Sequence, residues 1–165
     1  MRNMKDETAT RLLALNEQFY QTFGRQFSST RQRLQPGVWS LLDRLEGGET
    51  ILDLGCGNGG MARALVRRAH RGAYLGLDLS QPLLNAACDD GNPAQVQFIQ
   101  VDLASPGWEK CIPPSFPRPF DLVTAFAVLH HIPGQQNRQS LLSTVHTLLG
   151  PGGRFGCRGT GGHAG

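Results

Sequence analysis

The spacing of apolar residues along the chain changes near residue 50. Before that point, apolar residues recur every three to four positions, which is typical of amphipathic helices. Pro36-Gly37 divides this stretch and Gly47-Gly48 ends it, so two successive helical parts are predicted. The apolar positions are Leu12, Leu15, Phe19, Phe23 and Phe27, then Val38, Leu41, Leu42 and Leu45. We interpret residues 1–49 as a helical segment that forms a lid over a substrate or cofactor.

After residue 50, short apolar runs alternate with helical patterns, which favours an α/β fold with a parallel sheet covered by helices on both faces. Ser80 is available as the N-cap of the second helix. A stretch with five prolines between Pro106 and Pro119 excludes a long regular element there. The predicted strands are 51–54, 73–78, 96–102 and 120–126 with at most a stub at 153–157, and the predicted helices are 62–69, 82–88 and 137–149.

Composition narrows the class of protein without identifying it. The chain has 165 residues, of which 39% are hydrophobic and 18% charged, as expected of one globular domain. Its four cysteines are far apart with no C-x-x-C, so we expect neither a zinc site nor a disulfide framework. No apolar run approaches the ~20 residues of a membrane span, and no secretory signal is visible, so we expect a cytoplasmic protein without membrane contact.

Positive charge is concentrated in the first 71 residues, which hold 11 of the 16 Lys and Arg residues against 7 of the 13 acids. This imbalance would favour an anionic partner, although a solvated helix face explains it as well.

A glycine-rich loop lies between the first predicted strand and the helix that follows it. Gly55-Cys56-Gly57-Asn58-Gly59-Gly60 matches the pattern G-x-G-x-x-G, in which glycines let the backbone approach a ligand. A plain connecting turn has the same composition, and NAD-binding folds have the same loop.

Three acidic residues at the ends of successive predicted strands distinguish the cofactors. Asp53 would repel a pyrophosphate near the loop, whereas S-adenosylmethionine (SAM) carries an ammonium and a sulfonium that a carboxylate attracts. Asp78 lies 23 residues after Gly55, where it would accept the ribose hydroxyls of either cofactor. Asp102 would accept from an adenine amino group. Together these acids favour SAM.

Five segments, ILDLGCGNGG, YLGLDLS, FIQVDLA, FDLVTAFAVLHHI and LLGPGGRF, resemble in order and spacing the motifs of class I SAM-dependent methyltransferases with a methyltransferase type 11-like domain. The resemblance covers about residues 50–155 and implies a Rossmann-like fold. It implies that Asp53, Gly55 and Gly57 contact the methionine part of SAM. Asp78 would hold the ribose, and Leu79, Asp102 and Leu103 would frame the adenine. Phe126 and Ala127 would line the methyl-transfer pocket. The implied cofactor-binding residues are Asp53, Gly55, Cys56, Gly57, Asp78, Leu79, Asp102, Leu103, Phe126 and Ala127.

Phe27-Ser28-Ser29-Thr30-Arg31, together with the LHHI segment, is similar to methyltransferases that act on wobble uridines of tRNA. Small-molecule methyltransferases share LHHI, so the acceptor is either such a uridine or a small molecule. The resemblance implies Arg31, His130 and Arg138 as substrate contacts; Arg31 would alternatively meet the cofactor carboxylate or lie on the surface.

His130 and His131 invite two further hypotheses. On a helix, adjacent side chains point about 100° apart, so we expect no metal site. His131 is the candidate general base, with helix capping or a satisfied hydrogen bond as alternatives. Methyl transfer from SAM to a carboxylate would need no base, and the catalytic residue is otherwise unknown.

Family members continue through further strands after LLGPGGRF, whereas residues 156–165 are predicted to be a Gly-rich tail. We therefore expect a C-terminally truncated chain whose last sheet strands are missing. An active methyltransferase, a SAM-binding protein without activity and a partner subunit are the competing hypotheses, with an NAD-dependent oxidoreductase disfavoured by Asp53.

Overall fold

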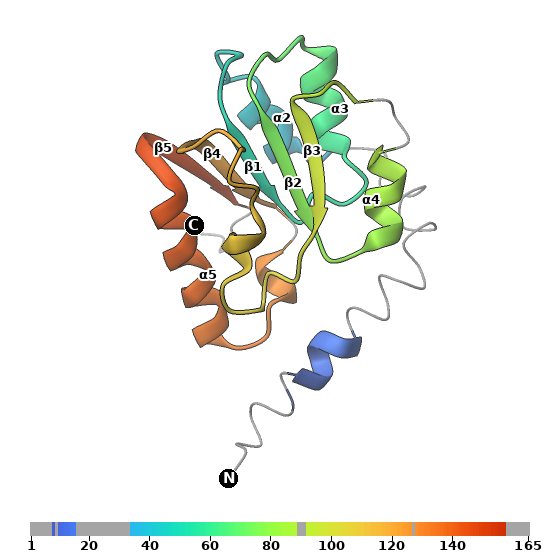
Figure 1. Cartoon of the computed structure of the whole chain (residues 1–165), viewed down its shortest axis with the longest axis vertical. Helices are drawn as coiled ribbons and strands as arrows, with labels where there is room; N and C mark the ends of the chain where they lie inside the picture. Colours follow the sequence, from blue (N-terminus) through green and yellow to red (C-terminus); the bar gives the residue numbers. More distant parts are fainter. Residues whose placement is uncertain (1–7, 9, 16–33, 89–91, 127, 158–165) are drawn as a thin grey trace, which may run out of the picture.

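The computed structural model describes residues 8, 10–15, 34–88, 92–126 and 128–157. Its centre is a five-stranded parallel sheet in the order β3-β2-β1-β4-β5 (Figure 1). Because β1 lies between β2 and β4, the strand order reverses beside it, and such a switch point opens a crevice at the carboxyl ends of the strands. The strands are β1 (Ile51–Leu54), β2 (Tyr74–Asp78), β3 (Val96–Gln100), β4 (Phe120–Ala125) and β5 (Leu149–Cys157).

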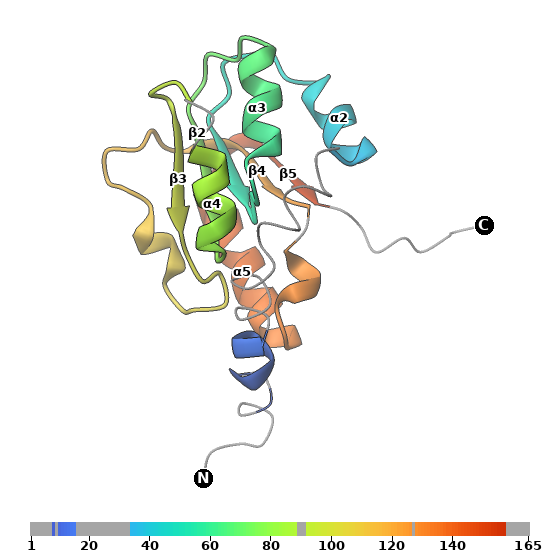
Figure 2. The ribbon, with the colours of Figure 1, turned by 90° about the vertical axis from the view of Figure 1, so that its right-hand side faces the viewer.

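Helices cover both faces of the sheet, which confirms the predicted α/β class (Figures 1 and 2). Side chains of α2 and α3 share one apolar core with Ile51, Tyr74 and Leu122. Side chains of α5 and η1 belong to a second core that contains Leu52 and Val123. The helices are α2 (Pro36–Leu42), α3 (Gly60–Arg67), α4 (Gln81–Cys88) and α5 (Gln135–Leu148), with two short 3₁₀ turns, η1 (Trp108–Cys111) and η2 (Leu129–His131).

Local sequence explains the elements that hold the site. Every residue of β1 is buried, as expected of a central parallel strand with helices on both sides. The N–H of Leu83 donates to the Ser80 hydroxyl at 3.4 Å, which agrees with the predicted cap, although α4 begins one residue earlier than expected. Among the helices of the described residues, none combines the length and apolar character that crossing a membrane requires.

The fifth strand is longer than the predicted stub, since β5 runs from Leu149 to Cys157. Its pairing with β4 shifts register between Phe120 and Leu122, and this irregularity accommodates Gly150-Pro151-Gly152 within the strand. A proline is tolerated there because no other described strand pairs with the outer side of β5. β5 also includes the first two residues of the predicted tail; residues 158–165 lie outside the described ranges.

Only part of the predicted N-terminal segment is described. Residues 10–15 are helical. α2 begins at Pro36, so Pro36-Gly37, predicted to divide the segment, forms the first turn of a helix, where a proline needs no N–H partner. Residues 16–33 lie outside the described part of the chain, so the lid stays a prediction.

Candidate cofactor site

A cavity of about 210 Å³ lies at the carboxyl ends of the strands, between the glycine loop, the segments after β2, β3 and β4, and residues near α2. Every predicted cofactor residue that the structure describes lines it; Ala127 lies outside the described residues. The lining therefore includes Asp53, Gly55, Cys56, Gly57, Asp78, Leu79, Asp102, Leu103 and Phe126.

The glycine loop takes a backbone conformation that L side chains rarely adopt. Gly55, Gly57 and Gly59 have φ angles of 73°, 58° and 79°. A Cβ on Gly55 would lie 2.0 Å from Cγ2 of Val128, whereas a Cβ on Gly57 would meet nothing within 4 Å. Gly55 thus allows the post-β4 segment to pack on the loop, and Gly57 leaves open space at the cavity wall.

Asp78 holds the loop in place from the end of β2. One carboxylate oxygen accepts the N–H of Gly57 at 2.8 Å and the other accepts the N–H of Ser80 at 2.8 Å. Burial raises the pKa of Asp78, and these backbone donors oppose that rise. Each oxygen keeps a lone pair for a further donor, so the loop contact adds to the predicted ribose role without replacing it. Gly57 and Asp78 are 21 positions apart in the sequence, and no sequence pattern indicated this contact.

Asp53 lies at the back of the cavity and is only 5% exposed. Its two oxygens accept hydrogen bonds from the Tyr74 hydroxyl at 2.6 Å and from the Thr124 hydroxyl at 2.8 Å. Burial raises the pKa of Asp53 to about 6, while both hydroxyls lower it. The sequence indicated a carboxylate near the loop but not the two strand residues that hold it.

Asp102 both fixes a turn and lines the cavity. Its oxygens accept the N–H of Ala104 at 2.9 Å and the Ser105 hydroxyl at 3.1 Å, which fixes the turn after β3. The same residue lines the cavity beside Leu103. A turn-forming contact therefore does not exclude a ligand contact at this position.

The prediction that the rings of His130 and His131 diverge is wrong. They lie in the single 3₁₀ turn η2 with ring centroids 4.0 Å apart, because one short turn does not impose regular helical spacing on the side chains. His131 lines the cavity, whereas His130 is exposed and is absent from its described lining. Among the residues that the structure describes, no group of three or more His, Cys, Asp or Glu could hold a metal ion.

The predicted substrate residues Arg138 and Arg31 are placed differently. Arg138 donates to the backbone oxygen of Ile132 at 3.0 Å, which ties α5 to the end of η2, and it is not in the described cavity lining. Arg31 lies outside the described residues. Their contacts with a substrate stay predictions.

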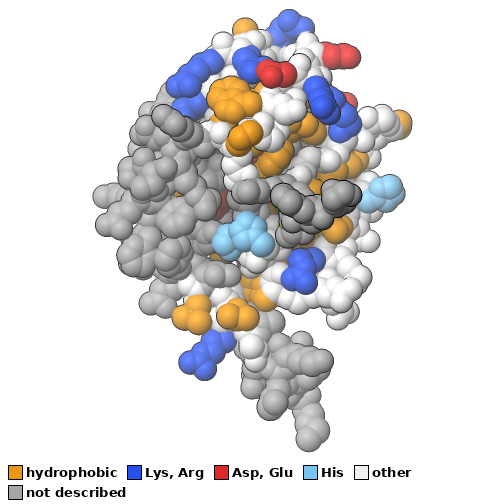
Figure 3. Space-filling view, turned by 180° about the vertical axis from the view of Figure 1, so that it is seen from behind, with side chains coloured by type: hydrophobic (Ala, Val, Ile, Leu, Met, Phe, Trp, Pro, Cys, Tyr) orange, Lys and Arg blue, Asp and Glu red, His pale blue; other side chains and the backbone are white. Residues whose placement is uncertain are grey.

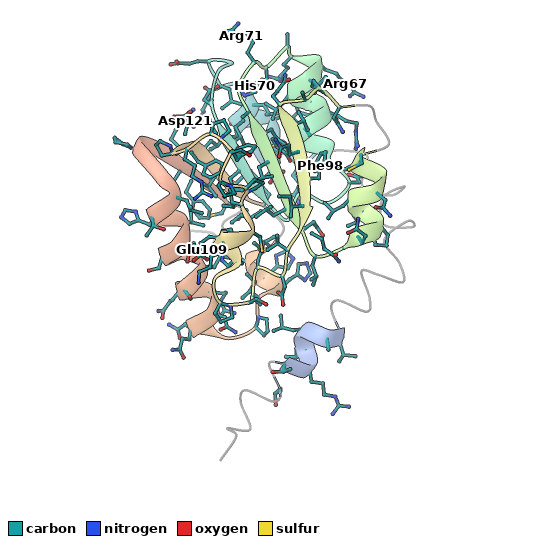
Figure 4. All side chains as sticks on the ribbon, viewed as in Figure 1. Arg67, His70, Arg71, Phe98, Glu109 and Asp121 are labelled. Carbon is teal, nitrogen blue, oxygen red and sulfur yellow. The ribbon has the colours of Figure 1, made fainter. Side chains whose placement is uncertain are left out.

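Two exposed arginines of the first half, Arg67 and Arg71, lie at the opposite end of the sheet from the cavity, whereas Arg11 is exposed on the helical stretch 10–15. Arg67 and Arg71 flank the connection into the amino end of β2, and several basic side chains gather in the upper part of Figure 3 (Figures 3 and 4). Arg68 pairs with Asp43 at 2.7 Å and its guanidinium lies 5.5 Å from the ring centroid of Trp39. These contacts agree with a solvated helix face.

Sequence reasoning missed the apolar wall of the cavity. The sequence indicated Val38 only as a core position of a helix, because periodicity does not distinguish a helix face in the core from one that lines a ligand cavity. Leu13 and Leu34 also reach the cavity from the N-terminal segment, as a lid would. The remaining lining residues that the sequence did not indicate as ligand contacts are Gln35, Asn58, Gly60, Met61, Leu83, Val101, Ala104, Val128 and Ile132.

A family profile described as a methyltransferase domain matches residues 52–155, which is more than half of the chain. The chain belongs to the class I SAM-dependent methyltransferase family. Within that family, the chain is 26% identical to a SAM-dependent methyltransferase from Thiobacillus denitrificans solved with S-adenosyl-L-homocysteine; the match covers 76% of this chain and 48% of that chain, with a TM-score of 0.55.

Curated relatives of this methyltransferase-family chain differ in acceptor. It is 30% identical to the tRNA (carboxymethyluridine(34)-5-O)-methyltransferase ALKBH8 of Macaca fascicularis, over 90% of this chain and 20% of the relative. It is 28% identical to the ubiquinone biosynthesis O-methyltransferase of Acinetobacter baylyi, over 64% of this chain and 41% of the relative. The chain thus spans less than half the length of either relative.

The composition of the cavity fits the cofactor of the family. Three carboxylates, Asp53, Asp78 and Asp102, line it, and no lysine or arginine does so among the described residues. Such a wall suits the cationic SAM and opposes the pyrophosphate of a dinucleotide.

Proposed function

We propose that this chain transfers the methyl group of SAM to a modified wobble uridine of tRNA. The observation that carries methyl transfer is the cavity at the switch point of the sheet, with its glycine loop and three carboxylates. The observation that favours tRNA is the match to the carboxymethyluridine methyltransferases, which extends over 90% of this chain and so includes the N-terminal segment.

In this proposal, different lining residues contact different parts of the cofactor. The loop backbone at Gly55 and Gly57 and the Asp53 carboxylate hold the methionine part, and Asp78 accepts the ribose hydroxyls. Leu79, Asp102 and Leu103 frame the adenine. Bound SAM would supply an electrophilic methyl group on its sulfonium. The residues of the chain then align the acceptor and exclude water, which are the main contributions a protein makes to such a displacement.

The acceptor side of the cavity is formed by the residues after β4. Phe126, Val128, His131 and Ile132 contribute an apolar wall with one imidazole. A carboxylate acceptor, such as the name of the tRNA-modifying relatives describes, is already a nucleophile and needs no base. A small-molecule hydroxyl is the second candidate acceptor, favoured by the ubiquinone relative, and it would need a base.

His131→Gln is therefore expected to lower the rate constant of methyl transfer to the tRNA acceptor less than tenfold, because no proton is removed before the methyl group is transferred. The measurement is single-turnover methyl transfer from pH 6 to 9, with His146→Gln, an exposed residue of α5 outside the described cavity lining, as the matched control. A loss of about 100-fold, together with disappearance of the pH dependence of the rate, would instead identify a base and a hydroxyl acceptor.

The function itself is tested with methyl-labelled SAM. The chain is incubated with bulk tRNA or with a small-molecule metabolite extract, and label is counted in each fraction. Label in digested uridine nucleosides is the expected result. Transfer to metabolites alone would contradict the tRNA acceptor, and transfer to neither, with SAM still bound, would favour a binding protein without activity. The partner subunit also stays a prediction.

A further inference from the structure

Behind the cavity, three neighbouring strands contribute a buried polar cluster that ligand contact does not explain. Asp53 of β1 accepts from Tyr74 of β2 and from Thr124 of β4, at 2.6 and 2.8 Å. Tyr74 is 1% exposed and Thr124 is fully buried. Both neighbours of Asp53 in β1, Leu52 and Leu54, are fully buried apolar residues. At positions 74 and 124, a Phe and a Val would have similar shapes to Tyr74 and Thr124 but no hydroxyl that needs a hydrogen-bond partner.

The two hydroxyls act on different oxygens of one carboxylate, so together they fix its orientation. Tyr74 donates to Oδ2 and Thr124 donates to Oδ1. Burial raises the pKa of Tyr74 well above its usual value, which keeps its hydroxyl protonated and able to donate. Each carboxylate oxygen can accept one further hydrogen bond, and Asp53 lines the cavity.

The other titratable groups around Asp53 disfavour its charge. Asp78 is a like charge, and the buried thiol of Cys56 provides no positive charge to offset it. No lysine or arginine lines the described cavity. Within the described site, the charged form of Asp53 is therefore stabilised by the two hydroxyls and by any cation that binds in the cavity.

We propose that Tyr74 and Thr124 are positioning residues that hold Asp53 as an oriented carboxylate for the positive charge of SAM. This inference rests on the proposed SAM site but not on methyl transfer or on the acceptor. It assigns the two hydroxyls a role in cofactor affinity that extends beyond packing.

The role predicts a particular pH dependence of SAM binding. The pKa of free Asp53 is raised to about 6, so well above pH 6 this carboxylate is charged before the cation binds. Below pH 6 the cation must displace a proton, and affinity falls by up to about tenfold per pH unit. Tyr74→Phe and Thr124→Val remove donors that favour the charged form, so each is expected to move this midpoint upward by about one unit.

Isothermal titration with SAM from pH 5 to 8.5 tests this on the wild-type chain and both variants. At pH 5 each variant is expected to bind about tenfold more weakly than wild type, at pH 7 about twofold more weakly, and the difference should vanish by pH 8.5. Phe98→Leu is the matched control: Phe98 packs edge-on against Tyr74, with ring centroids 5.9 Å apart, but does not touch the hydrogen bond (Figure 4 labels it). Its midpoint is expected to stay that of wild type.

Equal weakening of Tyr74→Phe at every pH, with an unmoved midpoint, would overturn the proposal and leave a structural role. Thermal unfolding of each variant shows that it is folded, and Thr124→Val provides a second test should Tyr74→Phe fail to fold. Asp53→Asn should remove the part of the pH dependence that has its midpoint near pH 6. Absence of SAM binding by wild type at pH 8.5 would instead refute the cofactor assignment itself, which is a different outcome.

Discussion

Gly55→Ala is expected to lower the free energy of unfolding by about 3–5 kcal/mol, whereas Gly57→Ala lowers it by about 1 kcal/mol. Both positions have positive φ, so both variants carry the strain of a left-handed L residue. Only at Gly55 would the new Cβ also lie 2.0 Å from Val128 Cγ2, which forces the post-β4 segment away from the loop. Urea denaturation of the three proteins measures the difference.

Val128→Ala supplies the matching control, because it removes the atom that the new methyl group would meet. In the Gly55→Ala background it should restore part of the stability, whereas in wild type it should cost about 1–2 kcal/mol through lost packing. Equal destabilisation by Gly55→Ala and Gly57→Ala would show that the contact with Val128 relaxes freely. Gly57→Ala should still weaken SAM binding, since its methyl group would project into open space at the cavity wall.

Asp78→Ala should weaken SAM binding at least about 100-fold. The variant loses two charge-assisted hydrogen bonds to the cofactor in our proposal and also the contact that fixes the N–H of Gly57, each worth about 1.5–3 kcal/mol. Isothermal titration at pH 8, chosen because burial raises the pKa of Asp78, measures the affinity.

Asp121→Ala is the control for that loss. Asp121 also accepts a backbone N–H, that of Thr50 at 2.8 Å, but it lies at the amino end of β4 and away from the cavity (Figure 4). Its removal should lower stability slightly and leave SAM affinity unchanged. Binding by Asp78→Ala within tenfold of wild type would remove Asp78 from the cofactor site.

The predicted parts of this protein were those encoded within short segments. Short apolar runs, apolar residues at helical spacing, glycines at a turn and acids at strand ends are local patterns of the sequence. They were enough to predict the α/β class and nine described residues of the cavity wall. They also indicated SAM, because the charge of the acids is a property of the sequence alone.

Tertiary structure decided which residues act together. Tyr74 and Thr124 meet Asp53 only because β1 lies between β2 and β4, in a register that follows from long-range pairing. Val128 reaches Gly55 across the same switch point, and the rings of His130 and His131 approach each other because η2 is too short to impose helical spacing. The sequence by itself determined which functional groups lie at each strand end. The pairing of parallel strands from distant parts of the chain determined how those groups are oriented toward one another.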